Sequence, residues 1–223
     1  MSFTLISATP SPFARMNRIT MLEKGIPFSL QNEIPWHKEE TITPQHNPLE
    51  KLPILLNPSD PTFEPVYDSA HIQRYLVEKF ANKGPKLLTG DIDLDLKAYQ
   101  LQVLSEGVMD AMVLRSFENA RAEEKQSKEW AERQTRKING GLKAFDELAK
   151  HRKGEYLIGD GKVYTIADIA VACAVGHLDF VDAVPGWREQ YPSIAEWFDK
   201  MERREYHAQT RPVMFDIKWD SIV

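Results

Sequence analysis

Strand patterns occur only in the first third of this 223-residue chain, and this confinement limits the folds that the chain can adopt. Four short segments have the composition of strands, and a run of turn residues at 57–61 predicts that the third and fourth form a hairpin. The predicted strands are Phe3–Ser7, Phe28–Ile34, Pro53–Leu56 and Phe63–Tyr67. Helix patterns follow the first strand, from Phe13 to Gly25, and the last strand, from Asp68 or Ser69 through Phe80. This order predicts a small mixed sheet covered by helices.

Helix formers dominate the chain after residue 90, between breaks that contain glycine or proline. The predicted helices cover residues 91–117, 127–150, 165–184 and 192–203. The segment from Ile166 to Val181 is apolar almost all round, as a central buried helix requires. We therefore predict a mixed-sheet domain at residues 1–82, a linker at 83–90 that contains the helix breakers Gly84 and Pro85, and an all-helical domain at 91–223.

Charge and composition exclude several classes of function. The net charge is -5, and residues 1–82 carry 7 basic and 9 acidic side chains against 21 and 24 in the remainder, so neither part offers a basic face for nucleic acid. Cys173 is the only cysteine, which excludes an intrachain disulfide, and the histidines lack zinc-ligand spacing, so no metal is expected. No apolar run reaches about 18 residues and the amino terminus lacks signal features, so we expect a cytoplasmic protein without membrane segments.

The segment Pro10-Ser11-Pro12-Phe13-Ala14-Arg15-Met16 links the first strand to the first helix. Ser11 followed by Pro12 has the form of an N-cap followed by the first helical position, so capping alone explains the pair. A helix start also favours negative charge, and an anionic sulfur bound there could accept a hydrogen bond from the Ser11 hydroxyl. The spacing leaves both interpretations open.

Two further segments lie near ends of predicted strands. Pro53 opens the third strand in Asn47-Pro48-Leu49-Glu50-Lys51-Leu52-Pro53, and an X–Pro bond is cis in only about one case in twenty. Asp68 and Ser69 begin the next helix, where they either cap it or hold an ammonium and a carboxylate of a ligand.

In order and spacing, these three segments resemble the cytosolic glutathione transferase family over essentially the whole chain, and they are most similar to its serine-type bacterial and fungal members. The resemblance implies a thioredoxin-like amino-terminal domain that binds glutathione as cosubstrate and an all-helical domain that shapes the pocket for an electrophilic or aromatic small molecule. It implies that Ser11 is the catalytic residue that keeps the glutathione sulfur as thiolate. Leu52, before a cis Pro53, would pair its backbone with the cysteinyl part.

The resemblance also implies the remaining contacts and a homodimer. Asp68 and Ser69 would bind the γ-glutamyl end, and Lys51 with Lys38 or His37 would contact the glycyl end. The implied glutathione-binding set is Phe13, Lys38, Lys51, Leu52, Pro53, Asp68 and Ser69. The second pocket would be walled by Phe13, Trp36, Met109, Met112 and Phe117, for which core packing is an equally good interpretation.

Departures from the family pattern bear on the chemistry. Asp68 stands where glutamate is more usual but keeps the charge, and a serine instead of a cysteine at position 11 favours thiolate activation over glutathionylation. Thr165 and Asp168 form a capping box, which we assign to folding, and Cys173 is interpreted as a core residue. A non-catalytic carrier of apolar or aromatic ligands, or a regulatory binding protein, is the alternative, although neither needs the complete first site.

Overall fold

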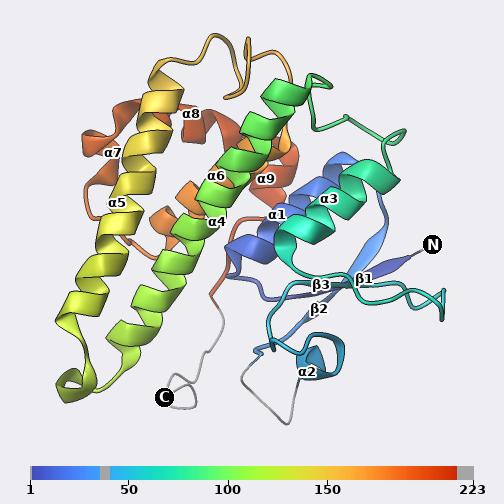
Figure 1. Cartoon of the computed structure of the whole chain (residues 1–223), viewed down its shortest axis with the longest axis horizontal. Helices are drawn as coiled ribbons and strands as arrows, with labels where there is room; N and C mark the ends of the chain where they lie inside the picture. Colours follow the sequence, from blue (N-terminus) through green and yellow to red (C-terminus); the bar gives the residue numbers. More distant parts are fainter. Residues whose placement is uncertain (1, 36–40, 215–223) are drawn as a thin grey trace.

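The computed structural model describes residues 2–35 and 41–214, and Figure 1 shows the sheet with its helices beside a bundle of longer helices. The first part contains β1 (Phe3–Ser7), α1 (Pro12–Glu23), β2 (Phe28–Asn32), α2 (Thr43–His46), β3 (Ile54–Leu56) and α3 (Ser69–Lys79). The second contains α4 (Ile92–Ala120), a short 3-10 helix (Glu123–Lys125), α5 (Lys128–Lys150), α6 (Ile166–Phe180), α7 (Trp187–Gln190), α8 (Pro192–Met201) and α9 (Glu205–Gln209). No helix in the described ranges is long and apolar enough to cross a membrane.

The sheet has the order β2-β1-β3, so β1 is its central strand. β1 runs parallel to β2 and antiparallel to β3, with Ile6 opposite Ile54. The predicted fourth strand at Phe63–Tyr67 is wrong, because the structure has only a single antiparallel bridge between Leu55 and Val66 there. Pro65 lacks the N–H that a longer ladder needs, and it directly precedes the bridge residue.

The long predicted helices are confirmed within a few residues at each end, because their caps are readable in the sequence. Ser127 accepts a hydrogen bond from the Trp130 N–H and so begins α5, and Asp91 accepts from the N–H groups of Asp93 and Leu94 at the start of α4. The short helices α2, α7 and α9 were not predicted, since single turns carry too little periodic pattern.

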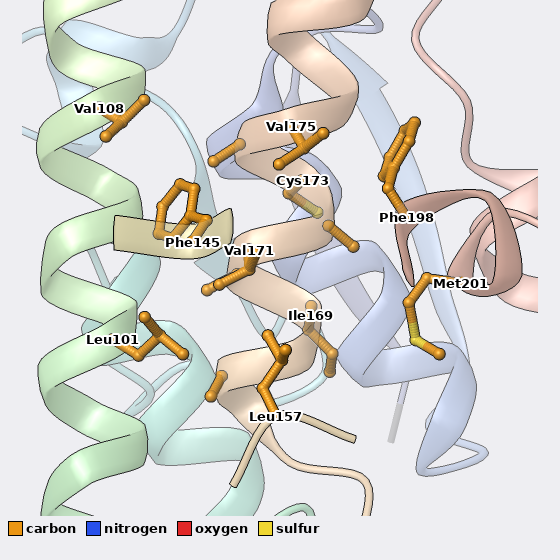
Figure 2. Close-up of a cluster of buried hydrophobic side chains, with 14 of the residues drawn as sticks. Leu101, Val108, Phe145, Leu157, Ile169, Val171, Cys173, Val175, Phe198 and Met201 are labelled. Atoms are coloured by element: carbon orange, nitrogen blue, oxygen red, sulfur yellow. The ribbon is translucent and has the colours of Figure 1, made fainter. Parts of the chain in front are cut away.

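α6 is the central helix of the bundle, as its apolar sequence predicts. Every residue from Ile166 to Leu178 is buried, and α6 packs against α4, α1 and α8. Figure 2 shows Ile169, Val171 and Val175 of α6 among side chains from α4, α5 and α8. Cys173 is fully buried in the same cluster, and burial raises the pKa of its thiol to about 12, so it is a core residue and not a nucleophile.

The start of α6 is fixed by a buried carboxylate. Asp168 accepts hydrogen bonds from the backbone N–H of Thr165 at 2.8 Å, from the Thr165 hydroxyl at 2.9 Å and from the backbone N–H of Leu157 at 2.9 Å. Burial raises the pKa of Asp168 to about 6, although these donors oppose the rise. All three of its partners are structural, which agrees with the assignment of this capping box to folding.

α1 joins the two parts of the molecule, because it packs against α3 on one side and against α6 on the other (Figure 1). The buried guanidinium of Arg15 donates to Glu202 at 2.5 Å and to the backbone carbonyl of His207 at 3.0 Å. The ammonium group of Lys24 donates to three backbone carbonyls after α3 at 3.0–3.1 Å. Both ends of α1 are therefore held by charge-assisted hydrogen bonds.

Candidate functional site

Ser11 caps α1, and its hydroxyl keeps a free donor. The Ser11 Oγ accepts a hydrogen bond from the Ala14 N–H at 3.2 Å, and Pro12 takes the first helical position, as the sequence predicts. The side chain is half-buried, and no acceptor within residues 2–35 and 41–214 takes its hydroxyl proton. A hydroxyl donates once and accepts twice, so Ser11 can cap the helix and still donate to a ligand.

The sheet brings the segment around Pro53 to the same edge as Ser11. β1 ends at Ser7 and leads directly into the Ser11 turn, while the antiparallel β3 begins at Ile54 beside Ile6. The Leu52–Pro53 peptide bond is cis, as the family resemblance implied. Within the described part of the chain, neither backbone polar group of Leu52 has a hydrogen-bond partner, which leaves both for a strand-like ligand.

The start of α3 reaches this edge as well. Val66 bridges to Leu55, so the antiparallel register carries the next residues of the chain back toward Leu52. Asp68 caps α3 by accepting from the His71 N–H at 3.2 Å and is exposed, whereas Ser69 is buried. The structure thus brings Leu52, Pro53, Asp68 and Ser69 together near the end of β1 that leads to Ser11.

Glu106 of α4 adds a carboxyl group to this cluster. The Ser69 hydroxyl donates to the Glu106 Oε1 at 2.7 Å, which links the start of α3 to the helical part. Burial raises the pKa of Glu106 to about 7, and the negative charges of Asp68 and Asp110 add to the rise while the Ser69 hydrogen bond opposes it. Burial likewise raises the pKa of Asp110, against the attraction of Lys51. A cationic group of a ligand would be attracted to this cluster.

The structure describes only some of the other residues that were predicted to contact glutathione or the second substrate. Lys51 is exposed and lies close enough to Asp110 to affect its charge. Phe13 is half-buried and packs against the core of the bundle. Lys38, His37 and Trp36 lie outside the described residues.

Met109 and Met112 do not line an open pocket, and that expectation is corrected by their burial. Their exposed fractions are 0% and 1%, and both belong to the core cluster around α6. The α4 face that carries them points into the bundle, so of the two interpretations left open by the sequence, core packing is the correct one. Phe117, five residues beyond Met112 on α4, is half-buried.

A separate cavity of about 440 Å³ lies between the C-terminal end of α4 and the N-terminal end of α5. Its lining includes Arg115, Glu118, Ser127 and Thr135, and none of the predicted site residues. Arg115 donates to the backbone carbonyl of Ala183 at 2.6 Å and to the Thr135 hydroxyl at 3.2 Å, so its guanidinium is already hydrogen-bonded within the protein. In the described residues, no cluster of histidine, cysteine and carboxylate side chains is arranged to hold a metal.

Sequence reasoning missed Glu106 and Asp110. Both lie on a long helix among many charged residues, and nothing in their local pattern sets them apart. Their proximity to Asp68, Ser69 and Lys51 depends on the packing of α4 beside α3, which only the fold reveals.

Known proteins are similar to this chain over both of its parts. The family model of the glutathione S-transferase N-terminal domain matches residues 10–79, and that of the C-terminal domain matches residues 128–200. A curated relative in Escherichia coli, the uncharacterized GST-like protein YibF, is 34% identical over 212 residues, which cover 93% of this chain and 98% of the relative.

Solved structures extend the likeness to the whole fold. A glutathione S-transferase from Methylobacterium radiotolerans in complex with glutathione sulfonate has 40% identity and a TM-score of 0.88, with 98% of each chain covered. One from Methylobacillus flagellatus with glutathione bound has 30% identity and a TM-score of 0.84, covering 95% of this chain and 100% of the other. The predicted combination of a thioredoxin-like domain and a helical bundle is confirmed, and the chain belongs to the glutathione S-transferase family.

Proposed function

We propose that this protein is a glutathione transferase that activates bound glutathione as a thiolate for attack on an electrophilic carbon of a small molecule. The observation that carries the proposal is the Ser11 hydroxyl, which keeps a free donor at the start of α1 beside the cis Leu52–Pro53 bond. The two structural relatives that hold glutathione or its sulfonate at 30–40% identity support it.

In the proposed reaction, the thiol proton of glutathione leaves to solvent and the sulfur lone pair forms a bond to carbon. A leaving group departs with its bonding electrons, or the adduct takes up a proton. The Ser11 O–H donates to the sulfur, and the α1 N-terminus adds favourable potential, so that both lower the thiol pKa. A larger thiolate fraction at neutral pH, held beside the electrophile, accounts for the rate.

The rest of glutathione would extend away from Ser11 along the edge of the sheet. We place its cysteinyl backbone against the unpaired backbone groups of Leu52, before Pro53. The γ-glutamyl carboxylate would meet the N-terminus of α3 and take the Ser69 hydroxyl proton in place of Glu106, and the ammonium group of the ligand would lie near Asp68. The glycyl carboxylate would be held by Lys51 and Lys38, and Phe13 would pack against the bound peptide.

The electrophile would bind on the open side of Ser11. We propose Phe13 of α1 and Phe117 of α4, both half-buried, for this wall, with Trp36 as a further candidate. Peroxide reduction starts from the same bound thiolate, so it is a second reaction to assay.

We also propose a homodimer, because α4 exposes an apolar stripe. Ile92, Leu96, Val103 and Leu114 are 72%, 58%, 60% and 41% exposed, and their spacing puts them on one side of the helix. Exposed apolar side chains on one helix face can form a protein contact, in which Asp110, exposed on the same face between Val103 and Leu114, would be a charged member, and twofold dimers are the commonest homo-oligomers. Light scattering at micromolar concentration should give about twice the 25.6 kDa of one chain. A mass near 25.6 kDa would contradict the dimer.

The function is tested with purified protein, glutathione and a panel of aromatic halides, unsaturated carbonyl compounds and organic peroxides. We expect saturable glutathione binding by calorimetry and turnover of at least one class, with turnover much lower in Ser11→Ala. Binding of glutathione without turnover of any class would favour the carrier interpretation.

A further inference from the structure

The hydroxyl proton of Ser69 is used within the protein. The Ser69 Oγ donates to the Glu106 Oε1 at 2.7 Å, across the contact between the start of α3 and the middle of α4. Among the described residues, Ser69 is the only hydrogen-bond donor to the Glu106 carboxyl group. A hydroxyl has one proton, so Ser69 cannot donate to Glu106 and to a ligand carboxylate at the same time. A ligand that takes this proton therefore leaves Glu106 in need of another donor.

A second hydrogen bond holds α3 beside α4 independently of Ser69. Gln73 lies one turn after Ser69 and Gln102 one turn before Glu106, and the Gln102 Nε2 donates to the Gln73 Oε1 at 2.7 Å. Both glutamines are buried, and the Gln73 Nε2 donates in turn to the Thr20 hydroxyl of α1 at 2.8 Å. Because this chain of buried hydrogen bonds does not include Ser69, Glu106 stays beside the start of α3 when Ser69 donates to a ligand.

The surroundings of Glu106 favour its protonated form. Burial, with smaller contributions from the charges of Asp68 at the α3 cap and Asp110 one turn further along α4, raises the pKa of Glu106 to about 7. Lys51, before β3, and Lys137 of α5 act on Asp110, whose negative charge they favour. Within the described residues, α1 and α6 also pack against α4 and add no charged group to this set. Glu106 therefore carries a proton in about half of the molecules at pH 7.

We propose that glutathione binding releases a proton from Glu106, because the γ-glutamyl group exchanges the hydrogen-bond partners at the start of α3. The inference rests on the proposed binding of glutathione at Asp68 and Ser69. The ligand carboxylate takes the Ser69 hydroxyl proton and meets the backbone N–H groups of Ser69 and Ala70, which have no acceptor within the described residues. The ligand ammonium group has three N–H donors, so it can contact Asp68 and also replace the neutral hydroxyl as the donor to Glu106. A charged donor stabilises the carboxylate form, and the carboxyl proton passes to solvent.

The test uses S-methylglutathione, which has no thiol, so a proton released on its binding does not come from the glutathione sulfur. Calorimetry at pH 7 in two buffers of different ionisation enthalpy measures the protons released by the wild type. If the ammonium group lowers the pKa of Glu106 by about one unit, we expect release of about 0.4 proton per site. The affinity should then rise about fivefold from pH 6 to pH 8, because the free protein holds the proton more tightly than the complex. Glu106→Gln keeps the side-chain size but cannot ionise, so it should release no proton and bind equally at both pH values.

Asp93→Asn is the matched control, because Asp93 is an exposed acid in the first turn of the same helix and should behave as wild type. Proton uptake, or no proton exchange, on binding to the wild type would overturn the inference without the use of any variant. Equal proton release in Glu106→Gln and the wild type would overturn it as well. If S-methylglutathione binds with proton release but the protein turns over no electrophile with glutathione, the inference holds and the proposed transferase activity fails. If S-methylglutathione does not bind, both fail.

Discussion

Both α1 and α6 begin with a hydroxyl residue at the N-cap, but the two hydroxyl groups have different hydrogen-bond partners. Each helix begins at a hydroxyl residue, Ser11 and Thr165 respectively. Thr165 is completely buried, and its hydroxyl donates to the Asp168 carboxylate, so its hydrogen-bonding capacity is used within the protein. Ser11 is half-buried, has no acid three residues later and retains its hydroxyl donor. We call the Thr165 cap closed, because its hydroxyl proton is taken by a second side chain, and such a cap has a structural role. We call the Ser11 cap open, because its hydroxyl proton has no acceptor within the described residues and is available to a ligand.

The largest expected effect is the loss of stability when the carboxylate that closes the α6 cap is removed. Asp168→Ala leaves the Thr165 and Leu157 N–H groups buried without acceptors and should lower the free energy of unfolding by about 4 kcal/mol. Urea denaturation measures this change. Asp160→Ala is the control, since Asp160 is an exposed acid of the preceding loop, and it should change stability by less than about 0.5 kcal/mol. Equal losses in the two variants would contradict a structural role for the closed cap.

The second largest expected effect is a change in stability with pH, caused by titration of Asp168. The folded-state pKa of Asp168 is about 6, above its ordinary value of 3.8, so between pH 4 and 6 the folded protein binds the proton more readily than the unfolded chain. The contribution of Asp168 to stability should therefore fall as pH rises through this window and stay constant above it. At about 1.4 kcal/mol per pKa unit, the change is about 3 kcal/mol. Denaturation of wild type and Asp168→Asn across pH 4–7 measures it, and parallel curves would refute it.

The start of α3 is a third cap, and it belongs to the proposed ligand site. Replacing both Asp68 and Ser69 by alanine should weaken glutathione binding at least tenfold, about 1.4 kcal/mol, because the carboxylate and ammonium groups of the ligand lose their partners. Calorimetry measures the affinity. Glu64→Ala removes an exposed acid from the preceding loop and should leave it unchanged. Unchanged affinity in the double variant would remove both residues from the site.

The smallest effect on stability is expected at the open cap. Ser11→Ala should cost about 1 kcal/mol, the usual effect of losing one capping hydrogen bond. Ser127→Ala is a matched control, because Ser127 begins α5 and accepts from the Trp130 N–H at the same 3.2 Å. Similar losses in both variants are expected by thermal denaturation, and a far larger loss in Ser11→Ala would indicate a structural role beyond capping.

The sequence predicted what local pattern encodes. The caps at Ser11, Asp68 and Thr165 and the apolar character of α6 follow from residue types at fixed spacings, and the structure confirms them. The prediction of a fourth strand was wrong, because it followed the hydrophobic composition of residues 63–67. It gave too little weight to Pro65, which has no N–H to donate to a strand ladder. The methionines of α4 were open to either interpretation, since periodicity shows that a face is apolar but not what covers it. Glu106 contacts Ser69 across helix packing, which a local pattern does not encode.

The Ser11 cap, in our proposal, activates the thiol of bound glutathione. The direct measurement is the ultraviolet thiolate absorbance of the glutathione complex, titrated with pH in wild type, Ser11→Ala and Ser127→Ala. A hydrogen bond to a charged sulfur contributes about 1.5–3 kcal/mol, so Ser11→Ala should raise the pKa of the bound thiol by about 1–2 units, while Ser127→Ala titrates as wild type. If all three complexes titrate at the same pH, Ser11 is only a helix cap and another donor stabilises the thiolate.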